Sequence, residues 1–309
     1  MYMDINNVKK YPIDDLMIYL KSALKVGDVQ TAAEISKFMT KNNLRYAEAL
    51  FLIGNFYLLK ENNDIAKGFY SRIIVECPNS PYLDLAKIKL TEMYIKDKNY
   101  TTAITQIKSI ANKKFTFKKK ALLALVYLES KKIKESEKLT RTIFYKILND
   151  KHGEILIKKL FLYYYKKKNL IKFRLYSNYL NRFRGNQILI NKLSARFYYY
   201  AKNYSLSFFY YYRLSTQKVE LDEAFFFLGK ISLLYHRNKR NAMRYLTKVI
   251  KDKKSTNMYK YNALYELAIL AKESRNNKKS KEYLKKIIST SPKREIKEKA
   301  KNLLEYYKF

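Results

Sequence analysis

The chain has 309 residues and a formal net charge of +37, from 64 lysine and arginine against 27 aspartate and glutamate residues. Six glycines and four prolines leave little turn material for a β-sandwich or a β-barrel, and the prolines all fall between predicted helices. No run of 18 apolar residues occurs, so no transmembrane helix is expected. A single cysteine, Cys77, cannot form an internal disulfide. The composition therefore predicts an all-α protein.

Residues 1–12 are predicted to be a lead-in to the first helix. The start lacks the basic segment, apolar core and small-residue cleavage site of a secretory signal. We therefore expect the cytoplasm by default, and a periplasmic or inner-membrane-associated location if the start is trimmed.

A repeating pattern extends over residues 13–292, and its clearest copy is AEALFLIGNFYLLKENNDIAKGFYSRIIVECP. In this copy Gly54 and Tyr57 mark one helix, Ala66 and Tyr70 mark the next, and Pro78 closes the turn. The small position of the second helix recurs every 33 to 38 residues, at Ala32, Ala66, Ala103, Ser136, Phe173, Ser207, Ala242 and Ser280. Small residues at this spacing let the backbones of two antiparallel helices approach closely.

These residues resemble the tetratricopeptide repeat, and the resemblance implies an α-solenoid of about eight helix pairs in one continuous array. The fifth copy departs most, because Phe173 is not expected to pack where a methyl or hydroxyl group normally lies. The alignment of KKKN at 166–169 with KDKN at 96–99 places this copy. Residues 293–309 predict a C-terminal capping helix with Ala300 on its apolar face, beside Ile296, Leu303 and Leu304.

Charge is uneven along the chain, since residues 155–219 contain no aspartate or glutamate but 14 lysines and arginines and 12 tyrosines. We expect repeats five and six to carry an unopposed positive field that attracts an acidic partner. The bias of an AT-rich genome toward lysine, asparagine, tyrosine and isoleucine is the alternative explanation of the total charge, although it accounts less well for an acid-free block.

The resemblance implies that the first helix of each repeat lines a groove for a partner protein. The partner-binding candidates at these positions are Phe51, Asn55, Lys158, Tyr165, Lys192, Arg196, Tyr199, Phe226, Lys230, Tyr265 and Lys272. Some family members clamp a carboxylate with lysine, asparagine and arginine. Here Asn55 occupies one clamp position, but Phe51 and Leu122 stand where the lysine and an arginine are expected, so the clamp is predicted to be absent.

Catalytic chemistry has little support in the sequence. The two histidines, His152 and His236, are predicted to lie in exposed turns without metal ligands nearby, and no glycine-rich phosphate loop or nucleophile elbow is present. We therefore expect no enzyme activity, no cofactor and no bound metal.

The favoured function is a protein-interaction scaffold with an aromatic and basic groove. Residues 78–107 resemble the repeats of bacterial envelope-assembly tetratricopeptide proteins, and the composition resembles that of spirochaetes, which use such proteins in the collar of the periplasmic flagellar motor. Nucleic-acid binding through the basic, tyrosine-rich repeats is the alternative. An anionic membrane surface is a third partner that the charge allows.

Overall fold

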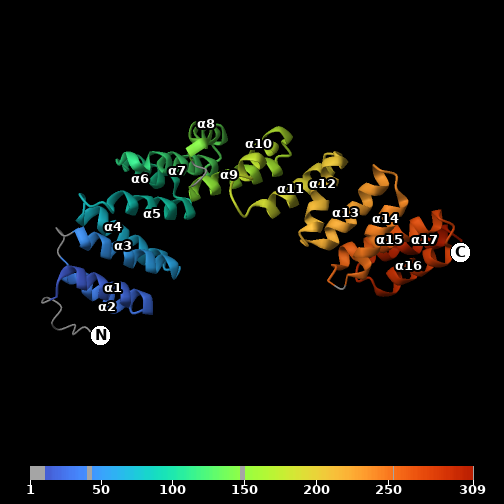
Figure 1. Ribbon diagram of the computed structural model, residues 1–309, viewed down its shortest axis with the longest axis horizontal. Helices are drawn as coiled ribbons and strands as arrows, with labels where there is room; N and C mark the ends of the chain where they lie inside the picture. The colour runs from blue at the N-terminus through green and yellow to red at the C-terminus, as the bar shows by residue number, and fades with distance from the viewer. Residues whose placement is uncertain (1–10, 40–43, 147–149, 253, 309) are drawn as a thin grey trace. The chain divides into compact units, whose positions relative to one another are not determined.

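The computed structural model describes residues 11–39, 44–146, 150–252 and 254–308. Over these residues the chain forms α-helices and two short 3-10 turns, η2 (Lys113–Phe115) and η3 (Phe144–Lys146), with no β-strand (Figure 1). The prediction of an all-α solenoid is therefore confirmed.

Sixteen of the helices in the described ranges follow one another as pairs. The pairs are α1 (Ile13–Val26) with α2 (Val29–Phe38), α3 (Leu44–Leu59) with α4 (Asn63–Glu76), α5 (Leu83–Lys96) with α6 (Tyr100–Ser109), α7 (Thr116–Glu129) with α8 (Ile133–Ile143), α9 (Lys151–Lys166) with α10 (Leu170–Leu180), α11 (Gln187–Tyr200) with α12 (Tyr204–Thr216), α13 (Leu221–Leu234) with α14 (Lys239–Lys251), and α15 (Asn257–Glu273) with α16 (Asn277–Thr290).

The chain divides into two compact units, residues 1–160 and residues 161–309, with the boundary inside α9. Within each unit, successive helix pairs pack against their neighbours along the chain. The prediction of one continuous array over residues 13–292 stays a prediction. Of the lead-in predicted at 1–12, residues 1–10 lie outside the described residues.

The small position of the second helix is inaccessible to solvent in all eight copies. In three copies it is a serine, and its hydroxyl donates to a carbonyl oxygen of the preceding helix. The pairs are Ser136 to Ala124 at 2.8 Å, Ser207 to Ala195 at 2.9 Å and Ser280 to Ala268 at 2.8 Å. Because each hydroxyl has a hydrogen-bond partner, serine can be buried at the position that alanine occupies in other copies. The hydrogen bond also links the two helices of the pair.

The turn between the two helices of a pair ends in the same way in every copy. Five residues before each small position the backbone is left-handed, with φ between 49° and 89°, at Gly27, Glu61, Lys98, Lys131, Lys168, Lys202, Arg237 and Arg275. The next residue immediately precedes the second helix, and in six copies its side chain accepts a backbone N–H three residues on; these caps are Asp28, Asn99, Asn169, Asn203, Asn238 and Asn276. The alignment of KKKN with KDKN is thereby confirmed.

The expectation that Phe173 would pack poorly is wrong. Phe173 is fully buried and stacks on Phe161 at 4.8 Å between ring centroids and on Phe197 at 4.3 Å. The residue twelve positions before the small position is also a phenylalanine here, Phe161, whereas repeats four, six and eight have alanine there. Two large residues therefore replace two small ones, and the fifth repeat is held by ring stacking instead of close backbone approach.

Helix α17 (Arg294–Tyr306) covers the end of the unit formed by residues 161–309. Ala300 is fully buried, and Ile296, Leu303 and Leu304 pack against the same apolar cluster as Leu284. The apolar face predicted for this helix is confirmed.

Candidate functional site

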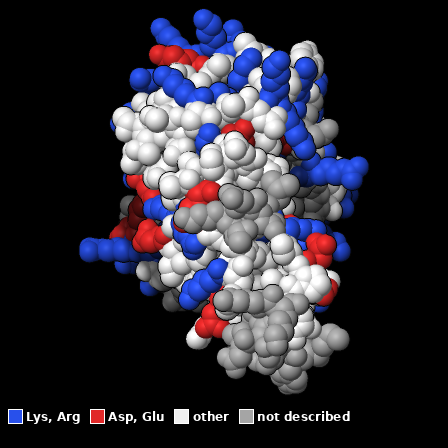
Figure 2. Space-filling view, turned by 90° about the vertical axis from the view of Figure 1, so that its left-hand side faces the viewer, with Lys and Arg blue, Asp and Glu red and all other residues white. Residues whose placement is uncertain are grey.

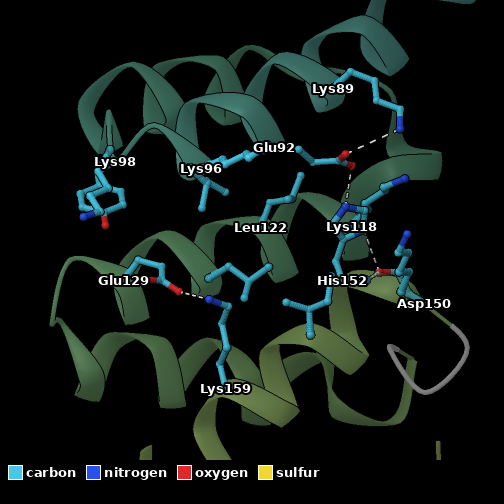
Figure 3. Close-up of a pocket in the computed structure, with 15 residues that line it drawn as sticks. Lys89, Glu92, Lys96, Lys98, Lys118, Leu122, Glu129, Asp150, His152 and Lys159 are labelled. Carbon is cyan, nitrogen blue, oxygen red and sulfur yellow. Dashed lines mark hydrogen bonds and ion pairs between the residues drawn. The ribbon is translucent and has the colours of Figure 1, made fainter. Parts of the chain in front are cut away.

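A hollow of about 570 Å³ opens among three first helices, α5, α7 and α9, in the unit formed by residues 1–160 (Figure 3). We call it the lysine hollow. Its lining residues are Lys89, Glu92, Ile95, Lys96, Lys98, Tyr100, Lys118, Leu122, Leu125, Glu129, Asp150, Lys151, His152, Ile155 and Lys159. Because Leu122, Leu125 and Ile155 are among them, the lining is apolar as well as charged.

Six lysines and three carboxylates line the lysine hollow. Two of the lysines pair with carboxylates of the lining. Lys89 lies 3.7 Å from Glu92, and Lys159 of α9 binds Glu129 of α7. Lys96, Lys98, Lys118 and Lys151 form no ion pair with any residue that the structure describes. The hollow therefore retains positive charge after its internal pairs are counted.

His152 lies in the first turn of α9, and the prediction that it is an exposed turn residue is wrong. It is 7% exposed, and its two ring nitrogens face different carboxylates. Nε2 lies 2.7 Å from Glu92 of α5, and Nδ1 lies 3.2 Å from Asp150, whose carboxylate also accepts the backbone N–H of His152 at 2.8 Å. His152 thus ties the third repeat to the fifth across the lysine hollow, as Figure 3 shows.

Two opposing effects set the protonation of His152. Burial acts to lower the pKa of the ring, but the hydrogen bonds with Asp150 and Glu92 outweigh it and raise the pKa above its ordinary value. Burial also acts to raise the pKa of Glu92, yet the His152 contact and the nearby lysines hold that pKa below its usual range. The three groups therefore favour a charged imidazolium between two carboxylates.

The carboxylates lie on opposite sides of the imidazole ring, so they do not converge on one point. In the described ranges no group of three or more histidine, cysteine, aspartate or glutamate side chains could hold a metal ion. His236, by contrast, is exposed in the turn between α13 and α14, as predicted.

In the unit formed by residues 161–309, the prediction of an unopposed positive field is wrong for two candidates. Lys192 of α11 binds Glu220, and Arg196 holds the carboxylate of Glu223 through Nε, at 2.6 Å, and Nη2. Both acids follow directly after the acid-free block and come from the next repeat.

The Arg196–Glu223 pair is half-buried, because the Arg196 side chain is 31% exposed. Glu223 is 5% exposed and also accepts a hydrogen bond from the Tyr211 hydroxyl at 3.2 Å. The hydrogen bonds to Glu223 raise the pKa of Arg196, and burial beside that carboxylate raises the pKa of Tyr211. Removing Arg196 would leave the buried carboxylate of Glu223 without its charged partner, which destabilises a fold. Arg196 therefore has a structural task, whatever else it binds.

The other basic candidates differ in whether their side chains already have a partner in the fold. Lys230 binds Glu266 of the next repeat, and Lys272 lies over the ring of Tyr307 at 5.2 Å and donates to its carbonyl. Lys158 is exposed and makes no ion pair within the described ranges.

The aromatic and polar candidates are all partly buried. Phe51 packs between Tyr70 and Tyr82, and Asn55 accepts the Tyr70 hydroxyl at 2.9 Å. In the second unit the rings also touch neighbours of the array: Tyr199 meets Phe227 at 4.6 Å, Phe226 meets Tyr259 at 5.5 Å, Tyr165 meets Phe197 at 6.0 Å, and Tyr265 packs against the last apolar cluster. Their role in binding stays a prediction, since each ring is also part of the packing.

Figure 2 shows one face of the molecule, on which lysine and arginine side chains are spread widely and carboxylates lie among them. Ion pairs within residues 1–160 agree with this view, since Lys21 lies 2.9 Å from Glu48 and Lys67 lies 2.6 Å from Asp97. Ion pairs between successive repeats therefore recur in both units.

Sequence reasoning did not select Lys96, Lys118, Lys151 or His152 for the site. Glu92 and His152 are 60 positions apart in the sequence. They come together because α5, α7 and α9 line the same hollow. The available signal was the clamp position of Leu122, which the resemblance places on the first helix of its repeat.

No helix within the described part of the chain combines the length and the apolar character needed to cross a bilayer.

Comparisons with known proteins address the fold. A family model of the tetratricopeptide repeat matches residues 48–80, the copy that carries Gly54 and Tyr70. The crystal structure of the C-terminal part of a TPR repeat-containing protein from Cytophaga hutchinsonii has a TM-score of 0.60 and 15% identity, covering 83% of this chain and 98% of that chain.

The assembly chaperone of RpL4 has 10% identity and covers 96% of this chain and 98% of that chain, but its TM-score of 0.27 carries no argument. No curated protein matches the chain. The chain therefore contains a match to the tetratricopeptide repeat at residues 48–80, and its consecutive helix pairs share the fold of a solved protein built from such repeats.

Proposed function

We propose that this protein is a non-catalytic scaffold that binds a partner protein through an acidic segment laid across the first helices of its repeats. The observation that supports the proposal most is the lysine hollow, where six lysines face three carboxylates on α5, α7 and α9. Four of these lysines form no ion pair within the described residues and repel one another. An acidic segment would relieve that repulsion.

The chemistry of the lysine hollow suits carboxylates on a peptide. Lys96, Lys118 and Lys151 supply ammonium donors, while Leu122 and Ile155 supply apolar surface between them. A peptide that carries both acidic and aliphatic side chains satisfies both kinds of lining. Such surfaces speed association through the long-range field and gain residence time from desolvated contacts.

The partner that we propose is a component of a cell-envelope assembly, such as the collar of a periplasmic flagellar motor. Support comes from the resemblance of residues 78–107 to envelope-assembly repeats. This same stretch contains α5 and Lys98, and so supplies one wall of the lysine hollow.

Nucleic acid is the competing partner. The basic and aromatic composition favours it, but helical-repeat RNA readers carry a recurring polar pair in each repeat, and no such recurrence is visible among the first-helix positions. Lys192, Arg196 and Lys230 also pair with glutamates. This reduces the charge available to phosphates.

The test is affinity capture of partners from the native organism, followed by mass spectrometry, with two charge-reversal variants. Lys96→Glu/Lys151→Glu changes two exposed lysines of the lysine hollow. Lys25→Glu/Lys37→Glu changes two exposed lysines of α1 and α2, neither of which forms an ion pair within the described residues. We expect the first variant to lose the main protein partner and the second to keep it. Equal loss from both variants would mean that only total charge matters.

A further inference from the structure

A second hollow, of about 520 Å³, lies in the unit formed by residues 161–309, where the ends of α9 and α11 meet the start of α10. We call it the turn pocket. Its lining includes three rings, one aliphatic side chain and two lysines: Tyr165, Phe197, Tyr200, Leu170, Lys166 and Lys168.

The turn pocket has a buried floor and exposed walls. Phe197 is 7% exposed and is held by stacking on Phe173, and Tyr165 contacts both of these rings. Tyr200 is 74% exposed and Leu170 is 44% exposed. A fixed aromatic floor beside solvent-exposed apolar walls is the arrangement in which a bulky apolar side chain gains most from burial.

The charge of the turn pocket has one sign. Lys166 and Lys168 are exposed, and neither forms an ion pair within the part of the chain that the structure describes. No carboxylate lines the pocket, and the surrounding stretch from 155 to 219 contains none. Residues that flank an inserted side chain are therefore favoured when they are acidic.

We propose that the turn pocket is the docking site for a bulky apolar side chain carried within an acidic peptide segment, with Lys166 and Lys168 binding the flanking carboxylates. The inference rests on the proposed function, because it assumes an acidic protein partner. It adds where that partner is anchored and what its anchor is.

Single-stranded nucleic acid fits this pocket less well. It needs successive exposed ring faces on which bases stack, whereas Phe197 and Tyr165 are engaged with Phe173 and leave Tyr200 as the exposed ring of the lining. The lining also has no amide or carboxylate side chain to read the edge of a base.

The test measures binding of short fluorescent peptides by anisotropy at physiological salt. One peptide has a Leu-Phe centre flanked by glutamate and aspartate, a second has Ala-Ala at the centre, and oligothymidine is the nucleic-acid probe. Lys168→Glu reverses a wall charge at a left-handed turn position that tolerates glutamate, since Glu61 occupies the same position of the second repeat. Lys131→Glu makes the same change at the matching position of the fourth repeat, away from the pocket.

A second pair of variants tests the apolar wall. Tyr200→Ser removes the exposed ring, and Tyr306→Ser removes a ring that is 79% exposed on α17, as the control. We expect Lys168→Glu and Tyr200→Ser each to weaken the Leu-Phe peptide about tenfold, and the two controls to change it little. The Ala-Ala peptide should bind more weakly and should not respond to Tyr200→Ser.

Equal weakening by Lys168→Glu and Lys131→Glu would overturn the proposal that the turn pocket is a docking site. Equal affinity for the Leu-Phe and Ala-Ala peptides would overturn it too. The proposed function would survive either result if Lys96→Glu/Lys151→Glu still abolished partner capture. Failure of both acidic peptides to bind the wild-type protein would contradict the pocket and the acidic partner together. Tighter binding of oligothymidine, weakened by Tyr200→Ser, would make the pocket a nucleic-acid site.

Discussion

At the scale of single residues, Gly54 shows most directly how the repeat constrains its sequence. A Cβ atom at Gly54 would lie 2.9 Å from a ring carbon of Tyr70. The Tyr70 side chain is fully buried, and its hydroxyl donates a hydrogen bond to Asn55. At Gly68, on α4, a Cβ would meet nothing within 4 Å.

We expect Gly54→Ala to lower the free energy of unfolding by about 1–3 kcal/mol through overpacking. Gly68→Ala should raise it by up to about 1 kcal/mol, because alanine is the better helix former at an exposed position. Urea denaturation followed by circular dichroism measures both. A stabilised Gly54→Ala protein would show that the helices of the second repeat can separate without cost.

The pH dependence of stability tests the His152 contacts. Because the folded-state pKa of His152 is raised above its ordinary 6.5, its contribution is complete below about pH 6.5 and is lost as the pH rises through the folded value. The free energy of unfolding should therefore fall as the pH rises from about 6.5 through the folded-state pKa of His152.

The chain has two histidines, so each controls for the other. His152→Gln should remove the fall in stability, and His236→Gln, in an exposed turn, should keep it. The denaturation midpoint at several pH values is the measurement. An unchanged slope in His152→Gln would rule out His152 as its origin.

At this scale the sequence predicts what is local. Small residues at a fixed spacing predict helix crossings, and Ser136, Ser207 and Ser280 are buried at those crossings. It does not predict contacts that depend on how neighbouring repeats stack, and for that reason His152 and the partners of Arg196 were missed.

At the scale of helices, the turn inside each repeat is the clearest regularity. A left-handed residue followed by a capping side chain recurs, but repeat four has Lys132 at the cap position, with no side-chain hydrogen bond. Its backbone angles, φ −84° and ψ 67°, are close to those of Asn99, φ −84° and ψ 75°.

Lys132→Asn should therefore cap α8 and stabilise the protein by about 0.5–2 kcal/mol. Lys132→Gln removes the same charge, but its side chain is longer than those that favour the cap position. It should therefore stabilise the protein little. Thermal or urea unfolding of the two variants distinguishes them. Equal stabilisation would assign the effect to charge and leave the cap without a role.

The fifth repeat marks the limit of pattern matching for whole helices. Phe173 breaks the small-residue rule, so the pattern alone predicts a poorly packed repeat. The paired change at Phe161 restores packing by another geometry. A repeat is therefore defined by the fit between its two helices, which a rule for one position does not capture.

At the scale of the whole molecule, the net charge of +37 is the feature that most needs an explanation. Part of it is met inside the fold, because Glu220, Glu223 and Glu266 pair with lysines and an arginine of the preceding repeat. The acid-free block led to the prediction of an unopposed positive field, and this pairing was missed because the acids lie just outside the block. Among the lysines without an ion pair in the described residues are Lys96, Lys98, Lys118 and Lys151 of the lysine hollow.

The central claim, that the lysine hollow holds an acidic protein segment, is tested most directly by salt dependence. The captured partner and a random oligonucleotide are titrated against the wild-type protein and Lys96→Glu/Lys151→Glu between about 50 and 200 mM salt. A protein partner should keep most of its affinity and lose mainly association rate, and the double variant should weaken it at every salt concentration. Tighter binding of the oligonucleotide at physiological salt, with partner binding untouched by the double variant, would contradict the account.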